Sequence, residues 1–378
     1  MVLLENPIYV AAVLAFMVVL AVYAEKTRLG KQLSAALLVI VFTAVLANLG
    51  VLPSASNSIP LYDGIFSYLA PISIFYLMLG VNLQALKKAG GPMIGLFVLG
   101  SLATVLGIVF GWYLLSPETV LGEDGKIIAG MLTGTYTGGS INFNAIALEY
   151  DFQERGVLYA GTIAVDNVIT TVWMVITLAI PPILKRFWIE KKVISGNSGN
   201  ATGHPEQPLT LSSLGGLLFL GVAALFISEA ISIWIPAIPS ILTLTSIGIV
   251  LAQIPFITRL GGAHVLGLYL VYVFLAVIGA YCEIEAVLTL KSLGGTLLAF
   301  TALAVAIHGV LIILLGGLFY RDWGMIAIAS QANIGGGTSA LALAESFERK
   351  ELILPAILVG TLGNALGTYL GFLVIQFL

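Results

Sequence analysis

Long apolar runs separated by short polar stretches dominate the sequence. Twelve such segments can be traced, and most reach or exceed the ~20 residues that a helix needs to cross a bilayer. They cover residues 7–24, 33–51, 64–84, 92–115, 127–148, 157–184, 209–233, 238–257, 263–282, 293–317, 323–345 and 352–377. A membrane barrel would instead show ~10-residue strands of alternating polarity. The pattern therefore predicts an all-α polytopic membrane protein.

The fifth and eleventh segments differ from ordinary membrane helices. Residues 133–144 read T-G-T-Y-T-G-G-S-I-N-F-N, and residues 330–339 read S-Q-A-N-I-G-G-G-T-S. Each glycine costs about 1 kcal/mol against alanine in a helix interior, and clustered hydroxyls and amides compete for backbone hydrogen bonds. Both segments should therefore unwind at their centres, each as a broken crossing or as a re-entrant hairpin.

The positions of Lys and Arg discriminate between these two topologies. If both segments cross the membrane, the 16 basic residues divide nine to seven between the two sides. If both are re-entrant hairpins, 13 of the 16 lie inside, all except Lys126, Arg155 and Lys291. Because inner loops carry an excess of Lys and Arg, the pattern favours ten crossings, two hairpins and both termini outside.

An internal repeat supports the same topology. Gly138 and Gly335 are 197 positions apart, and so are Asn167 and Asn364. The sequence thus predicts a first repeat over 1–190, a cytoplasmic linker over 191–208 and a second repeat over 209–378. Five crossings and one hairpin in each half would place the second repeat upside down relative to the first. Inverted repeats of this kind are typical of secondary transporters.

Composition narrows the functional classes. Hydrophobic residues make up 59% of the 378 residues and charged residues only 9%, which excludes a soluble enzyme. A net charge of −3 gives no indication of a nucleic-acid partner. No phosphate-binding loop of the G-x-x-x-x-G-K type is present, and we expect no cofactor other than a coupling ion.

The two glycine-rich tips are the first candidate site. Unwound backbone at membrane depth must line protein or a watery cavity, and half-helix N-termini can hold an anion there. The predicted substrate-binding residues are Thr137, Gly138, Gly139, Ser140, Asn142, Asn144, Gly335, Gly336, Gly337, Thr338 and Ser339. The alternative is that these small residues only permit close helix packing.

A lone acid forms the second candidate site. Asp166 lies near the middle of the sixth segment, where a carboxylate is costly and marks a cation ligand or a proton carrier. The predicted cation-binding set, with Na⁺ as a possible metal, is Asp166, Asn167, Thr170, Asn333, Thr361 and Asn364. The alternative role of Asp166 is a hydrogen bond between helices.

The motifs at 134–142, 166–167 and 333–338 resemble those of the bacterial membrane-protein family called domain of unknown function 819. That family is grouped with the cation:proton antiporter and anion transporter superfamily. The resemblance implies a protein of the bacterial inner membrane that works as an elevator and forms a homodimer. It also implies a scaffold, placed at 7–51 and 209–257, and a mobile transport domain, placed at 64–184 and 263–378.

Three functions compete at this point. The favoured one is a cation-coupled transporter of a small organic anion, with Na⁺ or H⁺ as the coupling ion. A sodium/proton exchanger without an organic substrate is the alternative, since Asp166 alone could alternate between the two ions. An intramembrane hydrolase with Ser140 as nucleophile and His308 as base is a remote third reading, and we expect no enzymatic activity.

Overall fold

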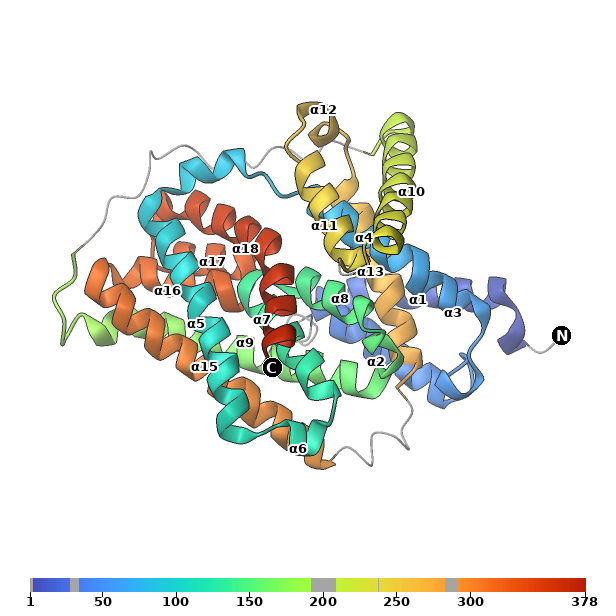
Figure 1. The fold of residues 1–378 in the computed structure, drawn as a ribbon, viewed down its shortest axis with the longest axis horizontal. Coiled ribbons are helices and arrows are strands. Elements are labelled where there is room, and N and C mark those ends of the chain that lie inside the picture. The colour runs from blue at the N-terminus through green and yellow to red at the C-terminus, as the bar shows by residue number, and fades with distance from the viewer. Residues whose placement is uncertain (1–2, 28–33, 192–208, 237, 283–290) are drawn as a thin grey trace.

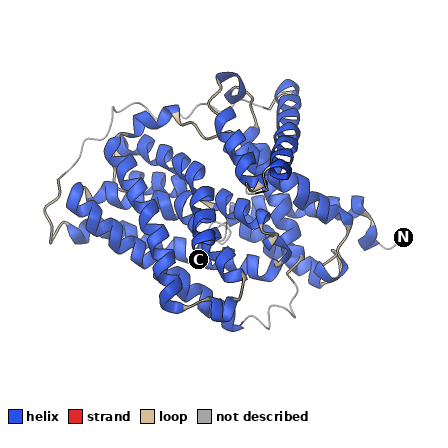
Figure 2. Ribbon diagram, in the orientation of Figure 1, coloured by secondary structure: helices blue, strands red, loops and turns tan. Residues whose placement is uncertain are grey.

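The protein is helical throughout the part of the chain that the structure describes. The computed structural model describes residues 3–27, 34–191, 209–236, 238–282 and 291–378. Figure 2 shows helices joined by short loops over these ranges, without a strand. The predicted linker at 191–208 lies outside the described residues except for Lys191. The predicted all-α class is confirmed.

The α-helices follow the apolar segments closely. Their bounds are α1 Pro7–Glu25, α2 Ser34–Asn48, α3 Pro60–Gly64, α4 Ala70–Met78, α5 Gly91–Leu115, α6 Glu118–Leu121, α7 Asp124–Gly138, α8 Ser140–Glu149, α9 Gly156–Leu184, α10 Leu211–Trp234, α11 Ser240–Leu251, α12 Pro255–Thr258, α13 Ala263–Ala280, α15 Lys291–Phe319, α16 Trp323–Ile334, α17 Gly336–Ser346 and α18 Lys350–Phe377. A π-helical turn, η4 (Ile65–Leu69), joins α3 to α4.

Eight helical stretches in the described residues are long and apolar enough to cross a membrane. They are Pro7–Glu25, Pro60–Met78, Gly91–Leu115, Gly156–Leu184, Leu211–Trp234, Ala263–Ala280, Leu293–Phe319 and Lys350–Phe377. Two further apolar helices, α2 and α11, are shorter than a full crossing. The chain is therefore a multi-pass membrane protein.

The helices divide into two groups (Figure 1). The frame helices α1, α2, α3, α4, α10, α11, α12 and α13 lie on one side of the view. The hairpin helices α5, α7, α8, α9, α15, α16, α17 and α18 pack mainly on one another, with α7 on α18, α5 on α15 and α16 on α9. Contacts between the groups run through α8, which meets α4 and α11, through α9, which meets α13 and α2, and through α18, which meets α11.

This grouping differs from the expected boundary between scaffold and transport domain. The predicted transport domain includes residues 64–78 and 263–280, and in the structure α4 and α13 pack against each other, with α2 on α13 and α11 on α4. Glycines allow these helices to approach closely: a Cβ at Gly248 would lie 2.7 Å from Met78, and one at Gly267 would lie 3.0 Å from Leu77. α4 and α13 therefore belong with the frame helices.

Both glycine-rich segments break where the sequence predicts. α7 ends at Gly138 and α8 begins at Ser140, with Gly139 at φ +96° between them. α16 ends at Ile334, and Gly336 at φ +77° opens α17. Only glycine adopts such φ angles without strain, which explains the position of each break.

Each pair of half-helices folds back on itself as a helical hairpin. Asp124 begins α7 and Arg155 follows α8, and their side chains form an ion pair of 2.8 Å. Asp322 caps the start of α16 and pairs at 3.0 Å with Arg349, which follows α17. The two ends of each segment therefore lie together, and the glycine break forms the tip opposite this mouth.

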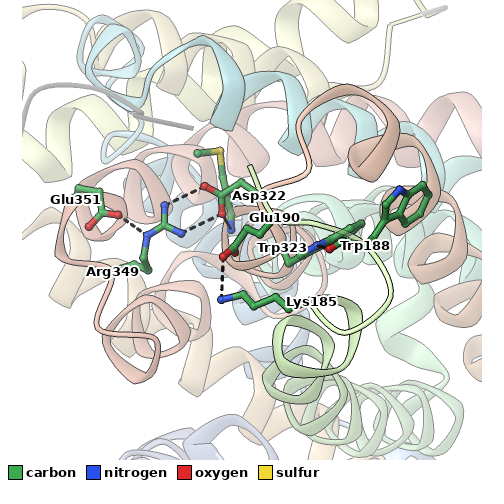
Figure 3. A network of polar contacts seen from close by, with 8 residues as sticks. Lys185, Trp188, Glu190, Asp322, Trp323, Arg349 and Glu351 are labelled. Carbon is green, nitrogen blue, oxygen red and sulfur yellow. Dashed lines mark hydrogen bonds and ion pairs between the residues drawn. The ribbon is translucent and has the colours of Figure 1, made fainter. Parts of the chain in front are cut away.

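The mouth of the second hairpin is the more elaborate of the two (Figure 3). The Arg349 guanidinium spans Asp322, which is fully buried, and Glu351. Burial would by itself lower the pKa of Arg349, but its hydrogen bonds to these two carboxylates outweigh that effect and raise the pKa. The Trp323 indole also donates to the Trp188 carbonyl at 3.2 Å, which ties the end of α9 to this mouth.

Candidate functional site

A seam of glycines brings the first hairpin onto α18. Gly130, Gly134 and Gly138 of α7 face Gly371, Gly367 and Gly363 of α18 in antiparallel order. Cβ atoms at Gly371 and Gly367 would each lie 2.7 Å from the facing carbonyl oxygen, and one at Gly138 would overlap the Gly363 carbonyl. Small residues at this spacing allow two membrane helices to make backbone contact.

The second hairpin tip meets the same turn of α18. A Cβ at Gly337 would lie 3.4 Å from the Cα of Gly360, only three residues before Gly363. One helical turn rises ~5 Å, so α18 holds the two tips within about one turn of each other. The predicted tip residues are thus brought together, although they come from hairpins about 200 residues apart in sequence.

At the first tip, the two asparagines serve the packing of helices. Asn142 is buried, and its Oδ1 accepts from the Thr368 backbone N–H at 3.0 Å and from the Thr368 hydroxyl at 2.7 Å. Asn144 accepts from the Tyr159 hydroxyl. Ser140 is exposed at the start of α8. Thr137 is fully buried, and its hydroxyl has no hydrogen-bond partner among the described residues.

At the second tip, the first turn of α17 is accessible. Gly335, Gly336 and Gly337 are partly exposed, and Thr338 is exposed. The Ser339 hydroxyl donates to the Gly336 carbonyl at 3.0 Å. These five predicted residues form the N-terminal turn of a half-helix, whose first backbone N–H groups have no acceptor within the helix.

Asp166 lies on α9, partly buried, with two hydroxyls near its carboxylate. The Thr170 hydroxyl donates to Oδ1 at 3.3 Å. Tyr136 of α7 places its phenol beside the same carboxylate, although the hydroxyl is aligned with no acceptor in the described part of the chain. An acid flanked by hydroxyl oxygens supplies the hard oxygen ligands that a small cation prefers.

The other predicted cation ligands are only partly gathered here. Asn167 donates to the Ile163 carbonyl in its own helix, and Thr361 donates to the Leu358 carbonyl. Asn364 faces the first tip, where a Cβ at Gly139 would lie 4.0 Å from its Oδ1. Asn333 is buried against α5, with its amide 3.0 Å from the Ser101 hydroxyl.

A buried hydrogen-bonded chain around His308 lies near the site, and its partners cannot be identified from the sequence. His308 of α15 lies 3.0 Å from the Gly100 carbonyl and from the Thr104 hydroxyl through Nδ1, and 2.9 Å from the Ser330 hydroxyl through Nε2. Ser330 also accepts from the Trp173 indole at 3.0 Å. These hydrogen bonds hold α5, α15, α16 and α9 together.

The same chain reaches the first hairpin. The Thr104 hydroxyl donates to the Tyr136 carbonyl at 3.0 Å, so the residue that faces Asp166 is fixed through α5 and His308. The Nε2 partner of His308 is Ser330 and not Ser140, the nucleophile of the hydrolase reading. No local motif marks this network, because its members lie on five helices.

An acidic cleft of about 410 Å³ lies between the mouth of the first hairpin and the frame helices. Its carboxylates are Asp63, Glu149, Asp151, Glu154 and Glu229, and no Lys or Arg belongs to its described lining. Burial raises the pKa of Glu149, despite hydrogen bonds from the Ile241 backbone N–H and the Ser240 hydroxyl. A cleft lined by one sign of charge raises the local concentration of cations.

Comparison with known proteins identifies the family of this chain. Residues 9–378 match a family described as a protein of unknown function (DUF819). The chain belongs to the DUF819 family. It is also similar to the uncharacterized membrane protein YjcL of Bacillus subtilis (strain 168), with 28% identity over 370 residues that cover 92% of this chain and 90% of that protein. The resemblance to the DUF819 family drawn from the glycine-rich motifs is thereby confirmed.

Proposed function

We propose that this DUF819 protein is a cation-coupled secondary transporter of a small organic anion. The observation that carries the proposal is the meeting of two helical hairpin tips on one turn of α18, in a chain whose α9 carries the acid Asp166. Opposed half-helix N-termini beside an intramembrane acid are the elements from which secondary transporters build their sites.

The coupling ion binds at Asp166 in this proposal. The carboxylate provides the charge, and the hydroxyls of Thr170 and Tyr136 provide neutral oxygens. An unoccupied Asp166 would repel an anion at the tips, whereas a bound Na⁺ or a proton removes that charge. Solute then binds well only to the cation-loaded form, which is the thermodynamic condition for coupling.

Inverted repeats account for the pairing of the helices. The shift of about 197 residues relates α7 to α16 and α9 to α18, and the packing pairs α7 with α18 and α16 with α9. Each hairpin thus packs on the long helix of the opposite half. The same relation pairs α5 with α15, whose directions are opposite because Gly107 meets Ala304 while Gly111 meets Phe300.

An elevator movement would carry the hairpin helices past the frame helices. Both tips, Asp166 and the His308 chain lie among the hairpin helices, so the complete site would move as one body. The frame helices, including α4 and α13, would stay fixed in the bilayer. In this proposal the frame helices of two copies of the chain form a homodimer. This is the elevator mechanism that the resemblance to the superfamily implies. In this proposal the boundary between moving and fixed helices follows the two packing groups.

Transport by reconstituted protein tests the proposal. Proteoliposomes containing the full chain receive a mixture of radiolabelled succinate, glutamate and citrate under an inward Na⁺ gradient, an inward H⁺ gradient or no gradient. We expect accumulation of at least one of these anions only with a gradient. Gradient-driven Na⁺ and H⁺ exchange without anion uptake would instead favour the exchanger.

Asp166→Asn is the decisive variant for the coupling ion. It keeps the size of the side chain and the hydrogen bond from Thr170 but removes the charge, so we expect gradient-dependent uptake to disappear. Glu118→Gln, an equivalent change at an exposed acid of α6, should transport like the wild type. Wild-type coupling in Asp166→Asn would overturn the assigned role of Asp166.

A further inference from the structure

Gln331 is a buried side chain with a donor that nothing in the described structure engages. The residue lies on α16, one turn before the second tip, and is fully buried. Its Oε1 accepts from the Thr177 hydroxyl at 3.2 Å, but its Nε2 has no hydrogen-bond partner among the described residues. A buried donor left unpaired is costly, and such groups call for a ligand or an ordered water.

The unpaired amide is aimed at the start of α17. A Cβ placed on Gly335 would overlap both Gln331 Nε2 and Ser339 Oγ, so only glycine at 335 lets these two polar atoms lie against the start of α17. α17 has 11 residues, and its first turn is accessible from the tip. Gln331 Nε2 therefore lies beside the first backbone N–H groups of that turn.

The groups at this point are mainly hydrogen-bond donors, and the Ser339 hydroxyl already donates its proton to the Gly336 carbonyl. The Thr177 hydroxyl, whose single proton also faces the Trp173 and Met174 carbonyls at 2.9 Å, lies 3.2 Å from the amide oxygen of Gln331, and the NH₂ group lies beside Gly335. The N-terminal end of a helix carries partial positive charge and stabilises anions. Neither α16 nor α17 contains Lys or Arg, so binding would rest on neutral donors.

We propose that Gln331 and the first turn of α17 together hold a carboxylate group of the transported solute. This inference rests on the proposed function for its physiological meaning, but it concerns binding and can be tested without transport. It assigns the anion to the second hairpin and makes Gln331 a solute-binding residue. The cation would then bind at Asp166 of α9, beside Tyr136 of the first hairpin.

Binding to the purified full chain in detergent tests the assignment. The probes are the sodium salts of acetate, succinate, glutamate and citrate, compared with sodium chloride at equal Na⁺. The readout is the thermal unfolding midpoint as a function of probe concentration, because a ligand that binds the folded state raises it. We expect at least one carboxylate to stabilise the wild type, and stabilisation by none would overturn the proposal.

Two variants alter the cradle in different ways. Gln331→Glu keeps the shape and the bond from Thr177 but places a carboxylate of the protein itself at the α17 N-terminus. It should unfold at the same or a higher temperature than the wild type and lose the response to the probe. Gly335→Ala would push Gln331 Nε2 and Ser339 Oγ away from the start of α17 and should weaken probe binding at least tenfold, as expected when a hydrogen bond to a charged group is lost.

Gln253→Glu is the matched control. The amide nitrogen of Gln253 already donates to the carbonyls of Val81 and Ile249, at 2.8 and 2.7 Å. This variant should lose stability and keep the wild-type probe affinity, the opposite pattern to Gln331→Glu. Unchanged probe affinity in both Gln331→Glu and Gly335→Ala would refute the carboxylate site.

Binding and uptake measured together distinguish a failure of this inference from a failure of the proposed function. Carboxylate binding that depends on Gln331, together with no uptake by proteoliposomes, would leave the site intact and overturn the transporter. Gradient-driven uptake that is insensitive to Gln331→Glu would leave the transporter intact and place the anion elsewhere.

Discussion

The two hairpins share a backbone design but differ in the polar groups they leave free. Each breaks at a glycine of positive φ, closes at its mouth with an Asp–Arg pair and touches α18 with its tip. Near the tip of the first hairpin, the buried side-chain groups without a hydrogen-bond partner among the described residues are the hydroxyls of Tyr136 and Thr137. In the second hairpin the free group is the amide nitrogen of Gln331.

This difference has a chemical meaning. A hydroxyl oxygen has lone pairs and can ligate a cation, whereas an amide NH₂ group can only donate hydrogen bonds. The hydroxyl of Tyr136 faces the acid Asp166, while the amide of Gln331 faces a helix N-terminus. The two hairpins therefore differ in the hydrogen-bonding groups that they leave free, and this difference suits the proposed binding of a cation on one side and an anion on the other.

The hairpin mouths differ in burial, and this leads to the largest expected effect on stability. Arg349→Ala would leave Asp322, fully buried, without its guanidinium partner. Removing one partner of a buried ion pair costs about 3–5 kcal/mol, so we expect a large fall in the thermal unfolding midpoint. Circular dichroism of the protein in detergent measures this.

The first mouth provides the comparison. The side chains of Arg155 and Asp124 are 46% and 21% exposed, so solvent screens their attraction. Arg155→Ala should therefore change the free energy of unfolding by about 1 kcal/mol or less. Equal destabilisation by Arg155→Ala and Arg349→Ala would contradict the account of the two mouths.

The tips should respond differently to one added methyl group. A Cβ at Gly138 would overlap the backbone of Gly363, which cannot move aside, whereas a Cβ at Gly337 would lie at an ordinary contact distance of 3.4 Å from Gly360. We expect Gly138→Ala to destabilise the protein by about 1–3 kcal/mol through overpacking. Gly337→Ala should unfold near the wild-type temperature, and the reverse order would argue against the glycine seam.

Asn142 gives a smaller effect, confined to the first hairpin. Asn142→Ala would remove the hydrogen bonds that Thr368 donates to Asn142 from its backbone N–H and its hydroxyl, at a cost of order 1 kcal/mol. Asn167→Ala is the control, since that side chain bonds only to a carbonyl of its own helix. A stability loss no larger than that of Asn167→Ala would show that Asn142 does not fasten the first hairpin to α18.

The sequence predicted the parts of this site that depend on local physics. Glycine weakens a helix wherever it stands, so the breaks near Gly139 and Gly336 could be located from the chain alone. An acid in an apolar run is costly in any context, which is why Asp166 stood out. The positions of Lys and Arg favoured hairpins over crossings, in line with the contacts that close both mouths.

The parts that depend on distant partners could not be predicted. Asn142 is predicted as a substrate-binding residue, and the sequence does not reveal that its Oδ1 accepts hydrogen bonds from Thr368, 226 residues away. Gln331 was passed over because only its bond with Thr177, 154 residues away, reveals that one end of its amide is free. The grouping of α4 and α13 with the frame likewise follows from helix packing that periodicity does not encode.

The central claim is that the first hairpin side holds a cation and the second an anion, with the two sites coupled. Its most direct test is the affinity of the purified protein for the best carboxylate probe, measured with and without Na⁺ and at two pH values. The account predicts that Na⁺ or protons strengthen carboxylate binding to the wild type and that this dependence vanishes in Asp166→Asn. Carboxylate binding that is equally strong with and without the cation would contradict it.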